Sequence, residues 1–245
     1  MTISVRIIAL ALLAACKGGE EAAAKTSSTA EGATPASAAS AVSPAPTSQA
    51  AASTQAAVST DPLVARADSA RIRGNPNAKV WMILSSDFQC PYCKMWHDSA
   101  DMTIRREYID NGKVRLAFVN YPIGSHQNAV PAAEYAMCAG AQNKFWEMHD
   151  ALFASQDKWV PLPKPDPVLE SLATSAGVEL NALRACVSSH KMLPIIQADH
   201  DKATQAGVRA TPSFFIGNQL LEGVQMPADL RKVLDAALAS ASGKP

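Results

Sequence analysis

Two cysteines separated by two residues are the most chemically informative feature of the sequence. Cys90-Pro91-Tyr92-Cys93 places two thiols at the spacing of a dithiol redox centre. One thiolate can attack a disulfide, and the second thiol can then resolve the mixed disulfide that forms. The motif therefore predicts thiol-disulfide exchange, with Cys90 as the accessible, attacking residue and Cys93 as the shielded, resolving residue.

The residues around the motif predict how the attacking thiol is activated. An amphipathic helix that begins at Pro91 is indicated by apolar side chains recurring three or four residues apart, namely Cys93, Trp96, Ala100 and Ile104. Cys90 then lies at the helix N-terminus, where free N–H groups and the helix dipole lower a thiol pKa to roughly 3.5–7.5. Pro91 stiffens the first turn and Tyr92 offers a hydroxyl, so we expect both to tune the redox centre.

Metal binding is the competing interpretation of two nearby thiols. Half of a zinc site has this form but needs two further ligands, and His97 would leave such a site one ligand short. We interpret His97 as an exposed helical residue and predict no metal and no cofactor. Copper(I) prefers soft thiolates, so a thiol-based copper-binding module is the alternative from another functional class.

The first cysteine of the chain is interpreted separately from the motif. Arg6 and the apolar residues 7–13 have the layout of a secretory signal, and Leu13-Ala14-Ala15-Cys16 resembles the bacterial lipobox. We predict a lipoprotein signal peptide over residues 1–15 and lipidation of Cys16; the alternative is an ordinary signal with an incidental cysteine. Lys17 stands where a retention aspartate would, which favours the outer membrane over the inner one.

Two further cysteines, Cys138 and Cys186, lie far apart in the sequence. In an oxidising compartment the simplest pairing joins Cys90 with Cys93 and Cys138 with Cys186. The alternative is that Cys138 and Cys186 are separate buried thiols that pack as small apolar residues.

Composition divides the chain into a linker and one domain. Residues 16–61 are rich in Ala, Ser, Thr, Pro and Gln, and no aromatic residue precedes Trp81. Such a segment buries too little apolar surface to offset its ordering entropy, so we predict a disordered tether before a domain over residues 62–245. The formal net charge is zero, which implies neither nucleic acid nor an anionic surface as a partner.

The pattern of elements predicts the fold class of the domain. A strand over 80–84 that is buried on both faces, the helix from Pro91 and a strand over 113–120 form a β-α-β unit. Helical spacing without a convincing strand fills residues of about 125–206. Strands over 213–216 and 219–222, a Gly217-Asn218 turn and a closing helix from about Pro227 complete the chain. This order predicts an α/β thioredoxin fold with an inserted all-helical domain.

Two segments resemble the DsbA-like branch of the thioredoxin superfamily: residues 86–93, which end in the motif, and Gly207-Val208-Arg209-Ala210-Thr211-Pro212-Ser213-Phe214-Phe215-Ile216. The resemblance implies that the Thr211-Pro212 bond is cis, faces the cysteines and leaves the Thr211 backbone free to pair with a substrate peptide. It also implies a structural role for His126 and favours a Cys138–Cys186 bridge. Many members carry a buried acid where this chain has Leu84, so either Asp87 or water is expected to take the proton of Cys93.

The resemblance leaves the direction of electron flow to be decided. We expect an oxidase of exported proteins that a membrane quinone-linked partner reoxidises; the alternative is a reductase or isomerase fed by a transmembrane electron carrier. Isomerases usually carry a folded dimerisation module before the catalytic domain, and this chain has a low-complexity segment there, so we expect a monomer. The predicted location is the periplasmic face of the bacterial envelope.

Overall fold

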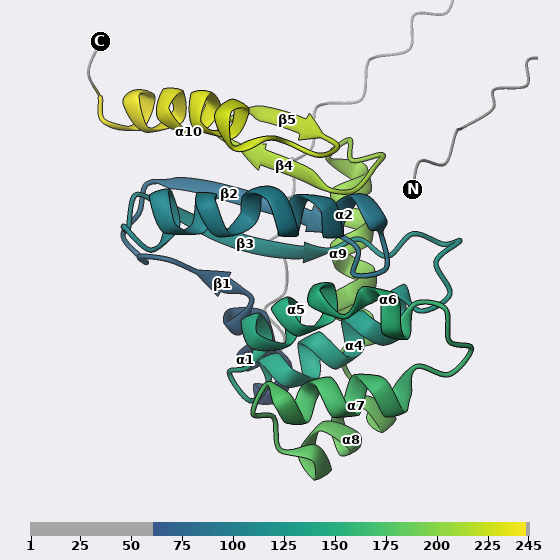
Figure 1. The fold of residues 1–245 in the computed structure, drawn as a ribbon. Helices are drawn as coiled ribbons and strands as arrows, with labels where there is room; N and C mark the ends of the chain where they lie inside the picture. The colour runs from purple at the N-terminus through teal and green to yellow at the C-terminus, as the bar shows by residue number, and fades with distance from the viewer. Residues whose placement is uncertain (1–60, 244–245) are drawn as a thin grey trace, which may run out of the picture. The chain divides into compact units, whose positions relative to one another are not determined.

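The computed structural model describes residues 61–243. The predicted signal peptide, the lipidation site Cys16 and all but the last residue of the predicted linker lie outside the described residues. The described part holds one mixed β-sheet and the helices packed on it (Figure 1). No helix in this part combines the length and apolarity that a membrane span requires.

The sheet has five strands in the order β1-β3-β2-β4-β5. They are β1 (Ile72–Arg73), β2 (Val80–Ser86), β3 (Val114–Asn120), β4 (Ser213–Ile216) and β5 (Gln219–Glu222). The central strand β2 pairs parallel with β3 and antiparallel with β4, while β1 and β5 form antiparallel edges. The parallel pair is the one predicted on both sides of the motif helix.

Only one face of the central strands is fully covered. Val114, Leu116 and Phe118 alternate along β3 and are completely buried. On β2, by contrast, Trp81 is 37% exposed, so the prediction that this strand is buried on both faces is wrong. Trp81 tolerates exposure because the Arg115 guanidinium lies 4.5 Å from the centre of its ring, a cation–π contact.

The motif helix is longer than one regular α-helix. It begins as α2 (Pro91–Trp96) and continues through the π-helical turn η1 (His97–Asp101), α3 (Met102–Ile104) and a second π-helical turn, η2 (Arg105–Ile109). The helix α10 (Pro227–Ala241) lies beside α3, and Tyr108 donates a hydrogen bond of 2.8 Å to Asp235 of α10.

Six helices lie between β3 and β4, in the segment predicted to be a helical insertion. They are α4 (Ala129–Gly140), α5 (Phe145–Ala154), α6 (Gln156–Trp159), α7 (Asp166–Ser175), α8 (Leu180–Ser189) and α9 (Leu193–Gln205). Figure 1 shows α4 to α8 gathered beyond the β1 edge of the sheet, with α9 leading back toward β4. The predicted thioredoxin fold with an inserted helical domain is confirmed. The helix α1 (Pro62–Ala70), which was not predicted, packs against α4.

A buried ion pair joins the insertion to the sheet. Arg71, directly after α1, donates to Asp199 of α9 and to the backbone carbonyl of Phe118 in β3. Asp199 also accepts hydrogen bonds from the backbone and the side chain of Asn120. Each buried charge therefore has several partners, as a charge in a water-poor interior requires.

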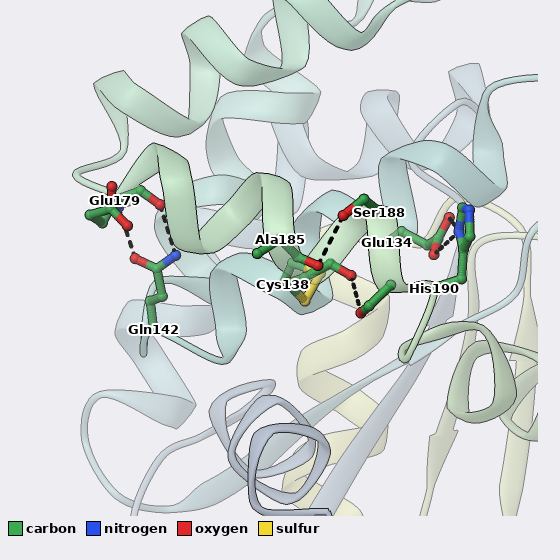
Figure 2. The surroundings of a disulfide bond; sticks show 9 residues. Glu134, Cys138, Gln142, Glu179, Ala185, Ser188 and His190 are labelled. Carbon is green, nitrogen blue, oxygen red and sulfur yellow. Dashed lines mark hydrogen bonds and ion pairs between the residues drawn. A yellow bond between two sulfur atoms is a disulfide. The ribbon is translucent and has the colours of Figure 1, made fainter.

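A disulfide joins two helices within the insertion (Figure 2). Cys138 of α4 and Cys186 of α8 are bonded, with an S–S distance of 2.00 Å and a sequence separation of 48 residues. Two polar contacts flank the bond: Gln142 exchanges hydrogen bonds with the backbone of Glu179, and His190 meets the Glu134 carboxylate at 3.0 Å. The helices α4 and α8 are thus held together along most of the length of α8.

Candidate active site

The two motif cysteines lie at the N-terminus of α2. Cys90 is the N-cap residue, Pro91 follows at the first helical position, and Cys93 lies one turn into the helix. Both cysteines are free thiols, so the structure holds the dithiol form and not the disulfide that the simplest pairing predicts. Thiol exchange uses both forms in turn.

Both cysteines are enclosed. Cys90 is 3% exposed and Cys93 is 1% exposed, so the expectation that Cys90 is accessible is wrong. A loop 121 residues further along the chain lies against Cys90, whose Sγ, in the thiol form, donates to the backbone carbonyl of Thr211 at 3.6 Å. Tyr92, between the cysteines, is 59% exposed and marks the outer surface of the site.

The surroundings separate the pKa values of the two thiols. A hydrogen bond from Cys93 is the largest of the effects that lower the pKa of Cys90 to about 6, and backbone N–H groups of the first turn add to it. Burial raises the pKa of Cys93, and the hydrogen bond to Cys90 raises it further. At neutral pH the pair therefore carries one negative charge, and this charge lies on Cys90.

The loop that faces Cys90 contains the only cis peptide bond in residues 61–243, between Thr211 and Pro212. Strand β5 holds this loop: Glu222 accepts hydrogen bonds from the backbone N–H groups of Arg209 and Ala210, and Gly223 donates to the carbonyl of Pro212 at 2.8 Å. No sequence pattern singles out Glu222, because its importance depends on the β4–β5 pairing.

The segment before α2 is fixed by side chains that the sequence analysis missed. Gln156 of α6 is buried and donates to the backbone carbonyls of Phe88 and Cys90, at 2.7 and 3.0 Å. Gln89 accepts a hydrogen bond of 2.7 Å from the backbone of Asn128 at the start of α4. The helical insertion thus holds the backbone of the redox motif, and no signal within the motif could have indicated these partners.

Asp87 does not direct its carboxylate toward Cys93. Its oxygens accept from the backbone N–H groups of Gln89 and Ile123 and lie 2.7 Å from Nδ1 of His126. Burial raises the pKa of Asp87, although these hydrogen bonds oppose the rise. It is the backbone N–H of Asp87 that lies against the Cys93 sulfur. His126 therefore connects the loop before α4 to the redox motif.

Leu84 lies at the position where many DsbA-like proteins are expected to carry a buried acid. It is 1% exposed and pairs in register with Phe118 on β3 and Phe214 on β4. A leucine between two phenylalanines completes an apolar layer under the motif. In the described residues, therefore, neither Leu84 nor the Asp87 carboxylate supplies a base beside Cys93.

The fold and the site together define a thioredoxin-fold protein with a dithiol centre, and comparison with known proteins agrees. Residues 66–236 match the family model described as thioredoxin. The match covers more than half of the chain, which therefore belongs to the thioredoxin family, in its DsbA-like branch.

Curated relatives with similar sequences carry two kinds of name. The probable disulfide bond formation protein D of Bacillus anthracis is 27% identical over 150 residues, which cover 60% of this chain and 69% of that protein. The Na(+)/H(+) antiporter NhaA 3 of Salinispora tropica is 31% identical over 179 residues. That match covers 73% of this chain, and this chain spans only 26% of the antiporter's length.

Solved structures with similar folds include a DsbA protein and BdbD. Alpha-DsbA1 of Wolbachia pipientis superposes with a TM-score of 0.64 and is 25% identical, covering 70% of this chain and 92% of that one. BdbD of Bacillus subtilis superposes with a TM-score of 0.62 at 21% identity, covering 69% and 92% of the two chains. The second likeness supports the fold alone.

Proposed function

We propose that this protein is a thiol-disulfide oxidoreductase that transfers the Cys90–Cys93 disulfide to exported proteins. The observation that carries the proposal is the place of Cys90 at the N-terminus of α2, against the Thr211 backbone and beside Cys93, which lowers its pKa to about 6. A thiolate stabilised in this way favours the dithiol form of the protein, which makes the disulfide form oxidising. The same low pKa makes Cys90 a good leaving group when a substrate thiolate completes its own disulfide. These two effects favour an oxidase over a reductase.

The proposed reaction consists of two exchanges. A substrate thiolate attacks the Cys90 sulfur, the Cys90–Cys93 bond breaks, and Cys93 leaves as a thiolate that takes a proton because its pKa is high. A second substrate thiolate then attacks the substrate sulfur of the mixed disulfide, and Cys90 leaves as a stable thiolate. The substrate loses two electrons and gains a disulfide, and the protein gains both electrons. We assign Thr211 and Pro212 to substrate binding and Pro91 and Tyr92 to redox tuning.

We further propose that the protein works in the bacterial envelope. The signal-like residues 1–15 and the lipobox-like Cys16 support lipid anchoring toward the periplasm, with Lys17 favouring the outer membrane. The proposed partners are cysteine-containing exported proteins and a membrane quinone-linked protein that takes the two electrons. A monomer needs no further subunit for either exchange.

The decisive experiment is to trap thiols in living cells and to determine the redox state of Cys90 and Cys93. An oxidase should hold this pair mostly as a disulfide, and a reductase or isomerase should hold it mostly as a dithiol. In vitro, Cys90→Ser should abolish oxidation of a reduced substrate protein, while the Cys138→Ala/Cys186→Ala variant, altered outside the site, should retain it. The reduction potential should lie between that of thioredoxin, about −270 mV, and about −120 mV. A potential at the thioredoxin value would exclude the oxidase role.

A further inference from the structure

A second polar cluster lies between the motif helix and the insertion. His97, in the helical run that follows the motif, faces His149 and Asp150 of α5, and the side-chain donor atoms of these residues all lie within 4.8 Å of one another. The His97 side chain is only 14% exposed, so its interpretation as an exposed helical residue is wrong. His149 is completely buried, whereas the Asp150 side chain is 44% exposed and opens the cluster to solvent.

We propose that His97, His149 and Asp150 bind a divalent transition-metal ion, with Zn²⁺ as the ion that fits best. Two imidazoles and one carboxylate form a ligand set that zinc accepts, with water in the fourth position. Ligand atoms of a tetrahedral zinc site lie roughly 3.3 Å apart, given bond lengths of about 2.0–2.1 Å. Nε2 of His97 lies 3.4 Å from Oδ1 of Asp150, and Nδ1 of His149 lies 2.8 Å from the same oxygen.

The residues behind the three ligands support this assignment. Nδ1 of His97 lies 3.0 Å from Oδ1 of Asp98. When this carboxylate accepts a hydrogen bond from Nδ1–H of the neutral imidazole, the Nε2 lone pair is directed at Asp150. A lone pair and a carboxylate in such contact need a cation between them, either a proton or a metal ion. A carboxylate on the outer nitrogen is the common arrangement behind a metal-binding histidine.

Arg105 provides the corresponding support for the carboxylate ligand. Its guanidinium contacts both oxygens of Asp150, at 2.9 and 3.3 Å, and meets the buried Asp101 carboxylate at 2.7 Å. Both Asp101 oxygens lack a well-formed hydrogen bond. The Asp101 carboxylate can therefore accept hydrogen bonds from Arg105 when a metal ion binds Oδ1 of Asp150. The π-helical turn η1 carries both His97 and Asp101, and such turns occur frequently at functional sites.

Isothermal titration with Zn²⁺ tests the proposal on the full-length chain. The Cys90–Cys93 pair is kept as a disulfide and any other free thiol is alkylated, so that sulfur cannot bind the ion. One Zn²⁺ should bind per chain, and Co²⁺ should give the visible absorption of a four-coordinate site. His97→Gln and Asp150→Asn should each weaken binding by about tenfold or more.

The matched control is His190→Gln, which removes a histidine that also contacts a carboxylate, Glu134, outside the cluster. This variant should bind Zn²⁺ as tightly as the parent chain. Circular dichroism shows whether each variant folds, and if a ligand variant does not, Asp98→Asn at a half-exposed position should still weaken binding by about tenfold. The proposal is overturned if the parent chain does not bind Zn²⁺ saturably, or if the folded ligand variants or Asp98→Asn bind it unchanged.

Discussion

At the scale of single residues, two thiols of one motif differ because their hydrogen bonds and burial differ. Cys90 receives hydrogen bonds that stabilise its charge, whereas Cys93 is enclosed and donates to the charge on Cys90. The chemistry of the pair is thus a property of its surroundings, and it can be tested by changing one donor at a time.

The alkylation rate of the reduced chain with iodoacetamide should report the titration of Cys90. Because only the thiolate reacts, the rate should be low below pH 5 and should rise with a midpoint near 6. Cys93→Ala removes the hydrogen bond that lowers the pKa most, so its midpoint should move upward. Cys93→Ser keeps a donor at the same place and should stay near the parent value. Equal midpoints in the two variants would contradict the role given to Cys93.

Leu84→Glu tests whether the resolving step lacks a base. A carboxyl group at this buried position should keep a raised pKa and accept the Cys93 proton near neutral pH, so the pH profile of the step in which Cys93 attacks a mixed disulfide on Cys90 should change. Leu84→Gln has a similar size and does not titrate, which makes it the control. Both variants bury a polar group in an apolar layer and should lose about 1–3 kcal/mol of stability or more, so the rates are measured well below the unfolding transition. Matching profiles for the two variants would show that an acid has no role here.

At the scale of elements, the periodicity of apolar residues and the turn signals predicted individual strands and turns. Buried residues alternate along β3, and the turn at Gly217-Asn218 connects β4 to β5 as predicted. The short strand β1 was missed, and α6 was not delimited within the predicted helical segment, because two and four residues are too few to establish a period. Both depend on tertiary partners: β1 pairs with β3, and α6 presents Gln156 to the motif.

Removing the Cys138–Cys186 bond should destabilise the helical insertion. In the chain-entropy description, a cross-link over 48 residues stabilises a fold by about 4 kcal/mol. The Cys138→Ala/Cys186→Ala variant should therefore unfold at a lower urea concentration than the parent, with both proteins kept oxidised at Cys90 and Cys93. Since the insertion also holds the motif through Gln156, a destabilised variant should lose exchange activity at a lower temperature. A variant as stable as the parent would contradict this account.

At the scale of the whole molecule, the site is built from segments far apart in the chain, and only some of their contacts could be predicted from the sequence. The motif and the Thr211-Pro212 loop were predicted to meet because both resemble parts of one known family. Nothing comparable linked Glu222 to the loop, Gln156 to the motif or His97 to α5. Their partners lie on different elements, so spacing along the chain carries no information about them. Side-chain contacts of this kind follow from the packing of the fold and were found only in the structure.

The charge on Cys90 should also make the stability of the reduced protein depend on pH. Its pKa is about 6 in the folded state, against an ordinary value of 9.0. A lowered pKa contributes stability that is fully present above the unfolded value and is lost as the pH falls through the folded value. Between pH 8 and pH 5 this amounts to about 2–3 kcal/mol. Other groups titrate in the same range, so the comparison is with reduced Cys90→Ala, which keeps all of them.

Urea unfolding at several pH values should therefore show a larger loss of stability on acidification in the reduced parent than in reduced Cys90→Ala. From pH 8 to pH 5, the free energy of unfolding of the reduced parent should fall by about 2–3 kcal/mol more than that of reduced Cys90→Ala. In the oxidised parent Cys90 does not titrate, so its pH dependence should follow that of the alanine variant. Together these curves link the thiolate to the oxidising strength of the disulfide, because the free energy that stabilises the dithiol form is the same free energy that drives transfer of the disulfide to a substrate. Parallel curves for the reduced parent and Cys90→Ala would mean that the thiolate is not stabilised by the fold, and the argument for an oxidase would lose its physical basis.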